Sequence, residues 1–311
     1  MNEMKKQKKI PKRRMRETTK PKQKPLIKIR KEAPPRGPEY FTTKNNQLAL
    51  NYNEYYMSPR EKVLYSVLSC VVGALVGYSF FGGLFKDEFN NPTILTLISD
   101  VIVMVIAGFV ARTIYMPIRQ QQLLENRKRQ LNLQFRDMLE AVTTSLNTGK
   151  NALNAFMEAK TGLANQYEEG AYILKELDII FGEVRNGMIL EDVLEDFGRR
   201  SGLDDIMDFA NVFRISLMRG GNMRDTIRNT YEIINDKITV QEEIKTMMAG
   251  TKLELYMMIV IPVVMIIMIK SISEDFARNF ATLSGVITEL VSIAIFVAAY
   301  FMSKKILDIK A

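Results

Sequence analysis

The chain has 311 residues, 47% of them hydrophobic and 25% charged, with a formal net charge of +8, one cysteine and no histidine. The lack of His removes the commonest general base and the commonest metal ligand, and Cys70 alone supports neither a disulfide framework nor a thiolate metal cluster. Composition therefore argues against hydrolytic or zinc chemistry, and we expect neither enzyme activity nor a metal or cofactor.

The first 62 residues form a basic tail. They contain 18 Lys/Arg against 6 Asp/Glu, so the positive charge of the whole chain belongs to this segment. Basic runs, scattered prolines and few apolar residues predict a disordered arm, and anionic lipid is its expected contact at ~1 kcal/mol per basic residue. An acidic protein partner is the alternative. Nucleic acid is disfavoured because Tyr52, Tyr55 and Tyr56 lie beyond the basic runs instead of among them.

Four apolar stretches are long enough to cross the hydrocarbon core of a membrane. They lie at residues 63–85, 93–116, 253–269 and 280–302. We expect an all-α integral membrane protein with a first membrane hairpin at 63–117, a central domain at 118–252, and a second hairpin with a short end at 253–311. Pro262 predicts a kink in the third stretch, because proline lacks the N–H that the helix needs.

Polar and small residues inside these stretches are the candidates for helix contacts. Gly73 and Gly77 form a GxxxG pattern, which lets another helix approach closely. Glu289 lies inside the fourth stretch, where a carboxylate must face protein, take up a proton or have a partner. Asp100 lies at a comparable depth in the second stretch, and the two carboxylates could share a proton.

The distribution of Lys and Arg predicts the orientation. Both ends of the chain and the segment after the second stretch are basic, whereas the turns near Lys86 and at 270–279 carry few cations. By the positive-inside rule, the termini and the central domain are cytoplasmic and the two turns face outward. This arrangement is that of a multi-pass protein of the cell membrane.

The central domain reads as helix throughout, because apolar residues recur at steps of three and four and never alternate over the length of a strand. Six helices are predicted, and no sheet. Their apolar stripes are Phe135, Met138, Leu139, Val142 and Leu146; Leu153, Phe156 and Met157; Ile173, Leu177, Ile180, Phe181 and Val184; Val193, Leu194 and Phe197; Ile206, Phe209, Ala210, Phe213 and Leu217; and Ile227, Tyr231, Ile234, Ile238, Gln241, Ile244 and Met248.

A turn at residues 219–222 separates the last two of these helices. Gly220 and Gly221 suit a helix C-cap, and Asn222 with Asp225 is expected to cap the helix that follows. That helix begins at Met223 and continues into the third apolar stretch with almost no linker. The exposed tip formed by Arg219, Gly220, Gly221 and Asn222 is a candidate partner interface.

A weak internal repeat supports this organisation. Ser145, Gly149 and Asn151 recur as Ser216, Gly220 and Asn222, at an offset of 71 residues. Each copy is a helix, a glycine turn, an Asn cap and a second helix, so one helical hairpin is used twice.

Four carboxylates form a second candidate surface, at Glu191, Asp192, Glu195 and Asp196. On a helix they lie on the side away from Val193, Leu194 and Phe197, which indicates a solvated face. The same face is one on which a basic surface of a partner could dock.

The pattern of Gly187, Leu194 and Arg199, the Arg219–Asn222 turn, Glu243-Ile244-Lys245 and an apolar run with Pro262 resembles the F domain of type II secretion systems. More closely, residues 119–303 are similar to the TadB/TadC-type inner-membrane proteins of tight-adherence (Flp) pilus machines, on the TadB side. The resemblance implies a cytoplasmic bundle of six antiparallel helices (the F domain) on a four-helix membrane platform.

The resemblance also implies the partners: a TadC-like F-domain protein, with which this chain would form an oligomer, a TadA-like secretion ATPase, and the transmembrane segments of pilins that the machine extracts and assembles. The alternatives are a small membrane transporter built on Asp100 and Glu289, and a membrane-anchored signalling or scaffold protein that uses the tail. The chain has no GxxxxGK[ST] loop to cradle phosphates, so it is not expected to hydrolyse nucleotide itself.

Overall fold

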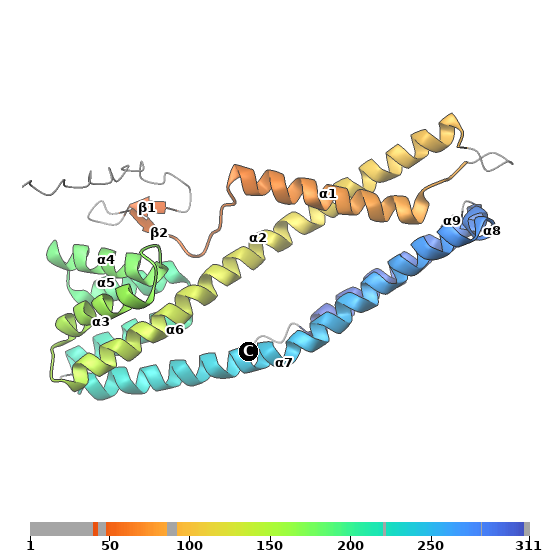
Figure 1. Cartoon of the computed structure of the whole chain (residues 1–311). Coiled ribbons are helices and arrows are strands. Elements are labelled where there is room, and N and C mark those ends of the chain that lie inside the picture. The colour runs from red at the N-terminus through yellow and green to blue at the C-terminus, as the bar shows by residue number, and fades with distance from the viewer. Residues whose placement is uncertain (1–39, 43–47, 86–91, 220–221, 281, 308–311) are drawn as a thin grey trace, which may run out of the picture. The chain divides into compact units, whose positions relative to one another are not determined.

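The computed structural model describes residues 40–42, 48–85, 92–219, 222–280 and 282–307. Helices dominate this described part, together with one two-stranded ribbon (Figure 1). In chain order the elements are β1 (Tyr40–Thr42), β2 (Leu48–Leu50), α1 (Pro59–Phe81), α2 (Ile94–Asn147), α3 (Ala152–Gln166), α4 (Tyr172–Arg185), α5 (Leu190–Ser201), α6 (Asp204–Met218), α7 (Met223–Ile272), α8 (Glu274–Phe280) and α9 (Leu283–Leu307).

Two of these helices are much longer than the rest. α2 has 54 residues and α7 has 50, which at ~1.5 Å per residue gives lengths of roughly 80 Å and 75 Å. Each contains both a membrane-length apolar stretch and residues of the domain core. The sequence predicted α7 as one helix, but it treated the second apolar stretch and the first domain helix as separate. The structure joins them, and Pro117 lies inside the continuous helix.

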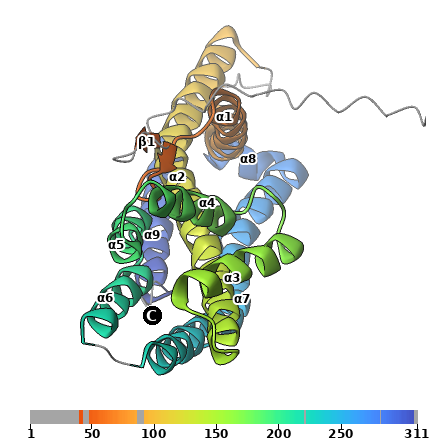
Figure 2. The ribbon, with the colours of Figure 1, turned by 90° about the vertical axis from the view of Figure 1, so that its left-hand side faces the viewer.

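Helices α2 to α7 share one hydrophobic core, and Figure 2 shows α3 to α6 grouped beside the ends of α2 and α7. At its centre Phe209 lies against Phe135, Phe156 and Phe213, with ring centroids 5.5, 6.5 and 5.8 Å apart. Most of the predicted stripe residues are buried, including all five of the first stripe. The 3.6-residue period alone located this core.

Two stripe residues were placed wrongly. Met157 is 53% exposed, because α3 turns the face of Ala155, Phe156, Ala159 and Leu163 inward and Met157 follows about 100° further round the helix. Leu217 is 43% exposed, because Ser216 takes the inward position in the last turn of α6, where its hydroxyl lies 3.2 Å from that of Thr226.

The tail also differs from its expectation. The prediction of disorder up to residue 62 is wrong for residues 48–58, which lie against the helical domain with Ala49, Tyr52 and Met57 buried. β1 and β2 pair in an antiparallel ribbon with Tyr40 opposite Leu50. The basic residues before position 40 lie outside the described residues.

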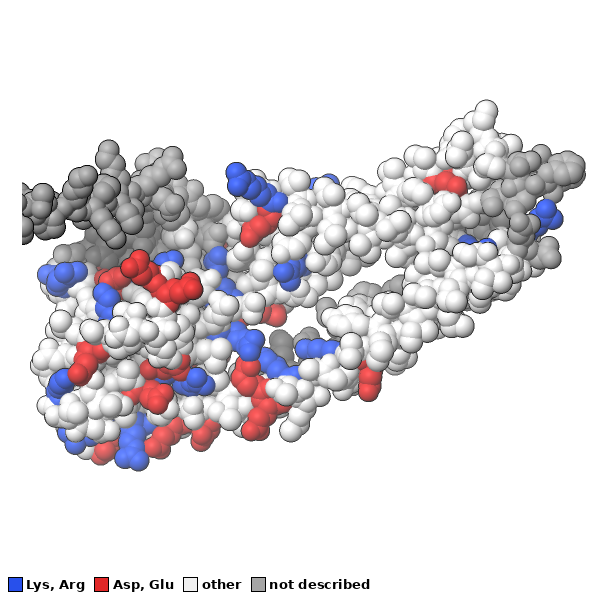
Figure 3. All heavy atoms as spheres, viewed as in Figure 1, with Lys and Arg blue, Asp and Glu red and all other residues white. Residues whose placement is uncertain are grey.

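Among the described residues, four helices are long and apolar enough to cross a membrane: α1, α2, α7 and α9. α1 starts at Pro59 instead of Val63, because Ser58 and Glu61 form a reciprocal capping box. It ends at Phe81 instead of Phe85, since Gly82 and Gly83 follow and Gly83 has a φ of +85°. Figure 3 shows charged side chains gathered over the domain and few along the apolar parts of these helices.

Candidate functional site

The acidic face of α5 is largely neutralised within the chain. The guanidinium of Arg214, on α6, lies 2.6 Å from Asp192 and 2.5 Å from Glu195, and that of Arg200 lies 2.8 Å from Asp196. Glu191 is half-buried. Sequence spacing placed the four carboxylates on one side of the helix but gave no sign of Arg214, which comes 22 residues after Asp192.

A hollow of about 290 Å³ lies beside this face, between α4, α5 and α6. Its walls are Ile179, Glu183, Met188, Asp192, Val193, Glu195, Asp196, Arg199 and Arg214. Four of these residues carry a carboxyl group and two a guanidinium, and Arg200 pairs with Asp196 from outside the lining. The described part of the chain has no group of three or more His, Cys, Asp or Glu placed to hold a metal ion.

The predicted turn after α6 is described at its two ends. Arg219 occupies the C-cap position of α6, its N–H donating to Ile215 O at 3.0 Å. Gly220 and Gly221 lie outside the described residues. Asn222 stands at the N-cap position of α7, but the prediction that its side chain caps the helix is wrong. The Asn222 amide donates instead to Asp225 Oδ2 at 2.5 Å.

The corresponding turn in the first copy of the internal repeat, between α2 and α3, lies wholly within the described residues. Gly149 has a φ of +87°, and Asn151 accepts a hydrogen bond from the backbone N–H of Asn154 at 2.9 Å. This turn between α2 and α3 has the cap that the sequence predicted for both copies. The two hairpins therefore share their helix–turn–helix order but differ in how the second helix begins.

A buried polar cluster that the sequence analysis missed fastens the chain before α1 to the domain. Tyr52 is 1% exposed, its hydroxyl donates to Glu176 Oε1 at 3.0 Å, and its backbone N–H donates to Arg200 O at 3.1 Å. Arg200 Nη1 lies 2.7 Å from Glu176 Oε2, with both side chains almost fully buried. Burial raises the pKa of Tyr52 and of Glu176, although Arg200 opposes the shift on Glu176.

The residues after Tyr52 extend this contact along α2. The Lys128 ammonium donates to Asn53 Oδ1 at 2.9 Å and to Gly202 O at 3.2 Å. The backbone oxygen of Tyr55 accepts from Gln120 at 2.7 Å. We call residues 48–58 the strap, because they connect α2, α4 and α5 just before α1 begins. The tyrosines at the end of the polar tail follow no helical or strand period, so sequence alone could not reveal the burial of Tyr52.

In the apolar helices, Gly73 and Gly77 of α1 face α2. A Cβ placed on Gly73 would lie 2.5 Å from Ala111 Cβ and 2.8 Å from Ala107 O, and one on Gly77 would lie 2.5 Å from Ala107 Cβ. Gly108 of α2 approaches the backbone of Cys70 in the same way. The α1–α2 contact thus depends on positions without a side chain.

The predicted pairing of Asp100 with Glu289 is wrong. Asp100 Oδ1 accepts from the backbone N–H of Gly83 at 2.8 Å, which ties the start of α2 to the end of α1. Glu289 is buried and its Oε1 lies 3.9 Å from the ammonium of Lys270, at the end of α7. The sequence predicts Lys270 as a cation of an outer turn, because nothing in it shows that the side chain points back toward α9.

Comparison with known families gives one match. Residues 139–269 match the model of the family described as Type II secretion system (T2SS), protein F. The match begins within α2 and ends within the apolar part of α7, so it covers the domain core from Leu139 onward and one candidate span. No curated protein and no solved structure matches the chain.

The family match confirms the resemblance to the F domain. Proteins of this family are membrane platform proteins of the type II secretion and type IV pilus kind. With four helices apolar enough to span a membrane, the match indicates a multi-pass inner-membrane protein. Residues 139–269 are therefore similar to the protein F domain of type II secretion systems.

Proposed function

We propose that this protein is an inner-membrane platform protein of a tight-adherence (Flp) pilus machine, in which it couples a cytoplasmic secretion ATPase to pilin extraction and filament assembly. One observation carries the proposal. α2 and α7 run without a break from the domain that matches the F family into helices long enough to cross a membrane. A helix is stiff along its axis, and both helices stay continuous through Pro117 and Pro262, so we expect displacement of the domain to reach the spans.

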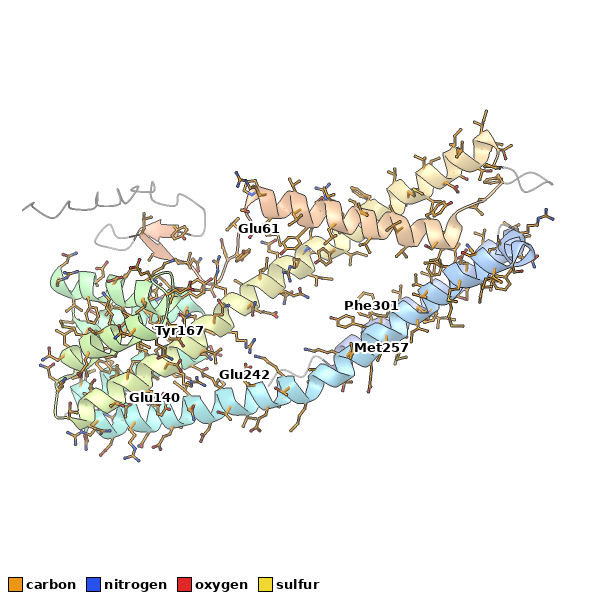
Figure 4. All side chains as sticks on the ribbon, in the orientation of Figure 1. Glu61, Glu140, Tyr167, Glu242, Met257 and Phe301 are labelled. Carbon is orange, nitrogen blue, oxygen red and sulfur yellow. The ribbon has the colours of Figure 1, made fainter. Side chains whose placement is uncertain are left out.

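Contacts between the two long helices support such coupling. Arg129 of α2 forms a two-pronged ion pair with Glu242 of α7, at 2.8 and 2.5 Å. Figure 4 shows Glu242 on the side of α7 that faces α2. The hydrogen bond from Arg129 lowers the pKa of Glu242, so the carboxylate stays charged near neutral pH. This pair joins the helices between the domain core and the apolar stretches.

The proposal places the segments 1–62 and 118–252, and both termini, in the cytoplasm, with the latter segment forming an antiparallel bundle of six helices. The hairpins 63–117 and 253–311 would lie in the membrane. The cation bias of the short loops supports this orientation. Cysteine labelling of intact and permeabilised cells tests it. Positions 40, 199 and 308 should react only after permeabilisation, and positions 88 and 275 in intact cells; Arg199 is the exposed domain position, next to buried Arg200. Labelling of an exposed domain position in intact cells would contradict coupling to a cytoplasmic ATPase.

The proposed partners are a TadA-like secretion ATPase, a TadC-like F-domain protein and the transmembrane segments of pilins, with the basic tail on anionic lipid. Co-purification of the tagged chain from its native membrane tests the first two. We expect both proteins in the eluate and loss of surface filaments when the gene is deleted. An eluate without either partner, together with normal filaments in the deletion strain, would overturn the proposal.

A transporter is less well supported by the same geometry. Asp100 accepts a backbone hydrogen bond from Gly83, and Glu289 lies next to Lys270. Each carboxylate thus has its own local structural contact.

A further inference from the structure

The C-terminal end of α1 lacks a cation of its own. The last four carbonyl groups of a helix have no intrahelical donor and carry partial negative charge, and no basic residue occurs in the last turn of α1. Gly82 N–H donates to Tyr78 O at 2.8 Å. The next N–H, that of Gly83, donates to Asp100 instead. The carbonyl group of Ser79, four residues before Gly83, therefore needs another donor.

Lys270 at the end of α7 supplies that donor. Its ammonium donates to Ser79 O at 3.0 Å and also to Phe80 O. The same ammonium lies 4.7 Å from the centre of the Phe280 ring on α8, at a distance suited to a cation–π contact. Lys270 thus supplies hydrogen bonds to the last carbonyl groups of α1 and joins this helix to α7 and α8.

Glu289 of α9 offers the same ammonium a second acceptor. Its side chain is 2% exposed, and neither carboxylate oxygen has a hydrogen bond. The separation of 3.9 Å between Lys270 Nζ and Glu289 Oε1 suits an ion pair but exceeds hydrogen-bond length. A shift of about 1 Å toward Glu289 would give a charge-assisted hydrogen bond of ~2.8 Å.

We propose that Lys270 is a two-position latch between the α1–α2 hairpin and helices α7 to α9. In the closed position its ammonium holds the carbonyl groups of Ser79 and Phe80. In the open position the ammonium moves onto Glu289 and α1 separates from α7. Glu289 makes opening possible, because an ammonium left without an acceptor in apolar surroundings is strongly unfavourable.

The apolar contact between α1 and α7 is too small to decide alone whether the two helices stay together. No residue in the membrane-length apolar window of α7 is buried. In a bilayer, moreover, apolar side chains gain little from leaving lipid for protein. The polar contacts of Lys270 therefore control whether α1 stays on α7. The latch concerns this chain alone and needs neither an ATPase nor a filament.

Distance measurements on the full chain in lipid nanodiscs test the latch. Cys70, the single cysteine, is replaced by serine, and spin labels are attached to cysteines at Val76 of α1 and Met268 of α7, which are 39% and 56% exposed. We expect a dominant short-distance population in this background. Lys270→Met should shift it to longer distances, whereas Glu289→Gln should increase the short population. Lys252→Met, an exposed lysine of α7, is the control and should leave the distribution unchanged.

The opposite responses of the two variants separate a latch from an ordinary ion pair. In an ordinary pair, removal of either charge disrupts the contact, so both variants would shift to longer distances. That result would overturn the latch, as would an unchanged distribution in either variant. If Lys270→Met does not fold, Glu289→Gln decides alone, because only the latch predicts a larger short population.

Discussion

The two ends of α7 differ in how much of their surface is packed against the rest of the protein. In the domain, Ile227, Ile234 and Ile238 are buried in a core shared by α2 to α7. In the apolar stretch of the same helix no residue is buried. α2 shows the same contrast between Leu131–Leu146 and its membrane-length part. The domain thus holds itself together, while the apolar ends leave most of their surface to lipid or to partner helices.

The largest expected effect comes from matched phenylalanines on the two sides of this contrast. Phe209 is 1% exposed in the core and Phe109 is 65% exposed in the apolar part of α2. Phe209→Ala should lower the free energy of unfolding by ~3–5 kcal/mol, because it leaves a cavity among three other rings. Phe109→Ala should change it by less than ~0.5 kcal/mol. Thermal unfolding of the full chain in detergent measures both; equal losses would remove the contrast.

Two glycine substitutions test whether the apolar parts of the helices pack closely against each other. Gly73→Ala should destabilise by ~1–3 kcal/mol, because the new methyl group would meet Ala107 and Ala111. Gly250→Ala, in open space on α7, should instead stabilise by up to ~1 kcal/mol, since alanine favours helix. The midpoint of unfolding in SDS reports both. A stabilising Gly73→Ala would mean that α1 does not approach α2 closely.

Tyr52 tests whether the strap belongs to the domain. Tyr52→Phe removes the donor to buried Glu176 and should cost ~1–3 kcal/mol. It should also speed proteolysis within residues 48–58. The control is Tyr56→Phe, because Tyr56 is 41% exposed and its hydroxyl donates to exposed Glu54. If the two variants behave alike, the strap does not depend on the buried cluster.

Arg214 gives the smallest expected change in stability and a test of the acidic face. Because its side chain is 35% exposed, Arg214→Ala should cost only ~0–1 kcal/mol. It frees Asp192, while Glu195 keeps its pair with Arg199 at 3.3 Å, so affinity for a basic partner surface should rise, most strongly at low salt. Binding of a purified secretion ATPase at two salt concentrations measures this, with exposed Arg185→Ala as control. Weaker binding would place Arg214 itself in the interface.

The sequence predicted the structural features that depend on the spacing of apolar residues and on composition. Residues such as Phe135, Phe209 and Ile234 recur at helical spacing, so their burial followed from the pattern alone. The F-domain resemblance rested on glycine, arginine and leucine spacing, and the family match at 139–269 confirms it. Neither kind of signal depends on which distant helix a side chain meets.

Contacts between segments far apart in the chain could not be predicted from the sequence. Tyr52 and Glu176 are 124 residues apart, and Lys270 reaches a carbonyl group 191 residues earlier. A single polar residue has no period, and its partner is set by how whole helices pack. The same reason explains the wrong pairing of Asp100 with Glu289, which rested on depth in the membrane alone.

The central claim is that α2 and α7 transmit displacement between the domain and the spans as continuous helices. Insertion of three glycines after Gln122 of α2, or between Ala249 and Gly250 of α7, interrupts each helix between core and span. The same insertion at Gly170, in the exposed α3–α4 connection, is the control. With all variants present at wild-type levels in the membrane, we predict that the two helix insertions abolish filament assembly and retain ATPase binding, while the loop insertion retains both. Normal filaments in both helix-interrupted variants would contradict the account.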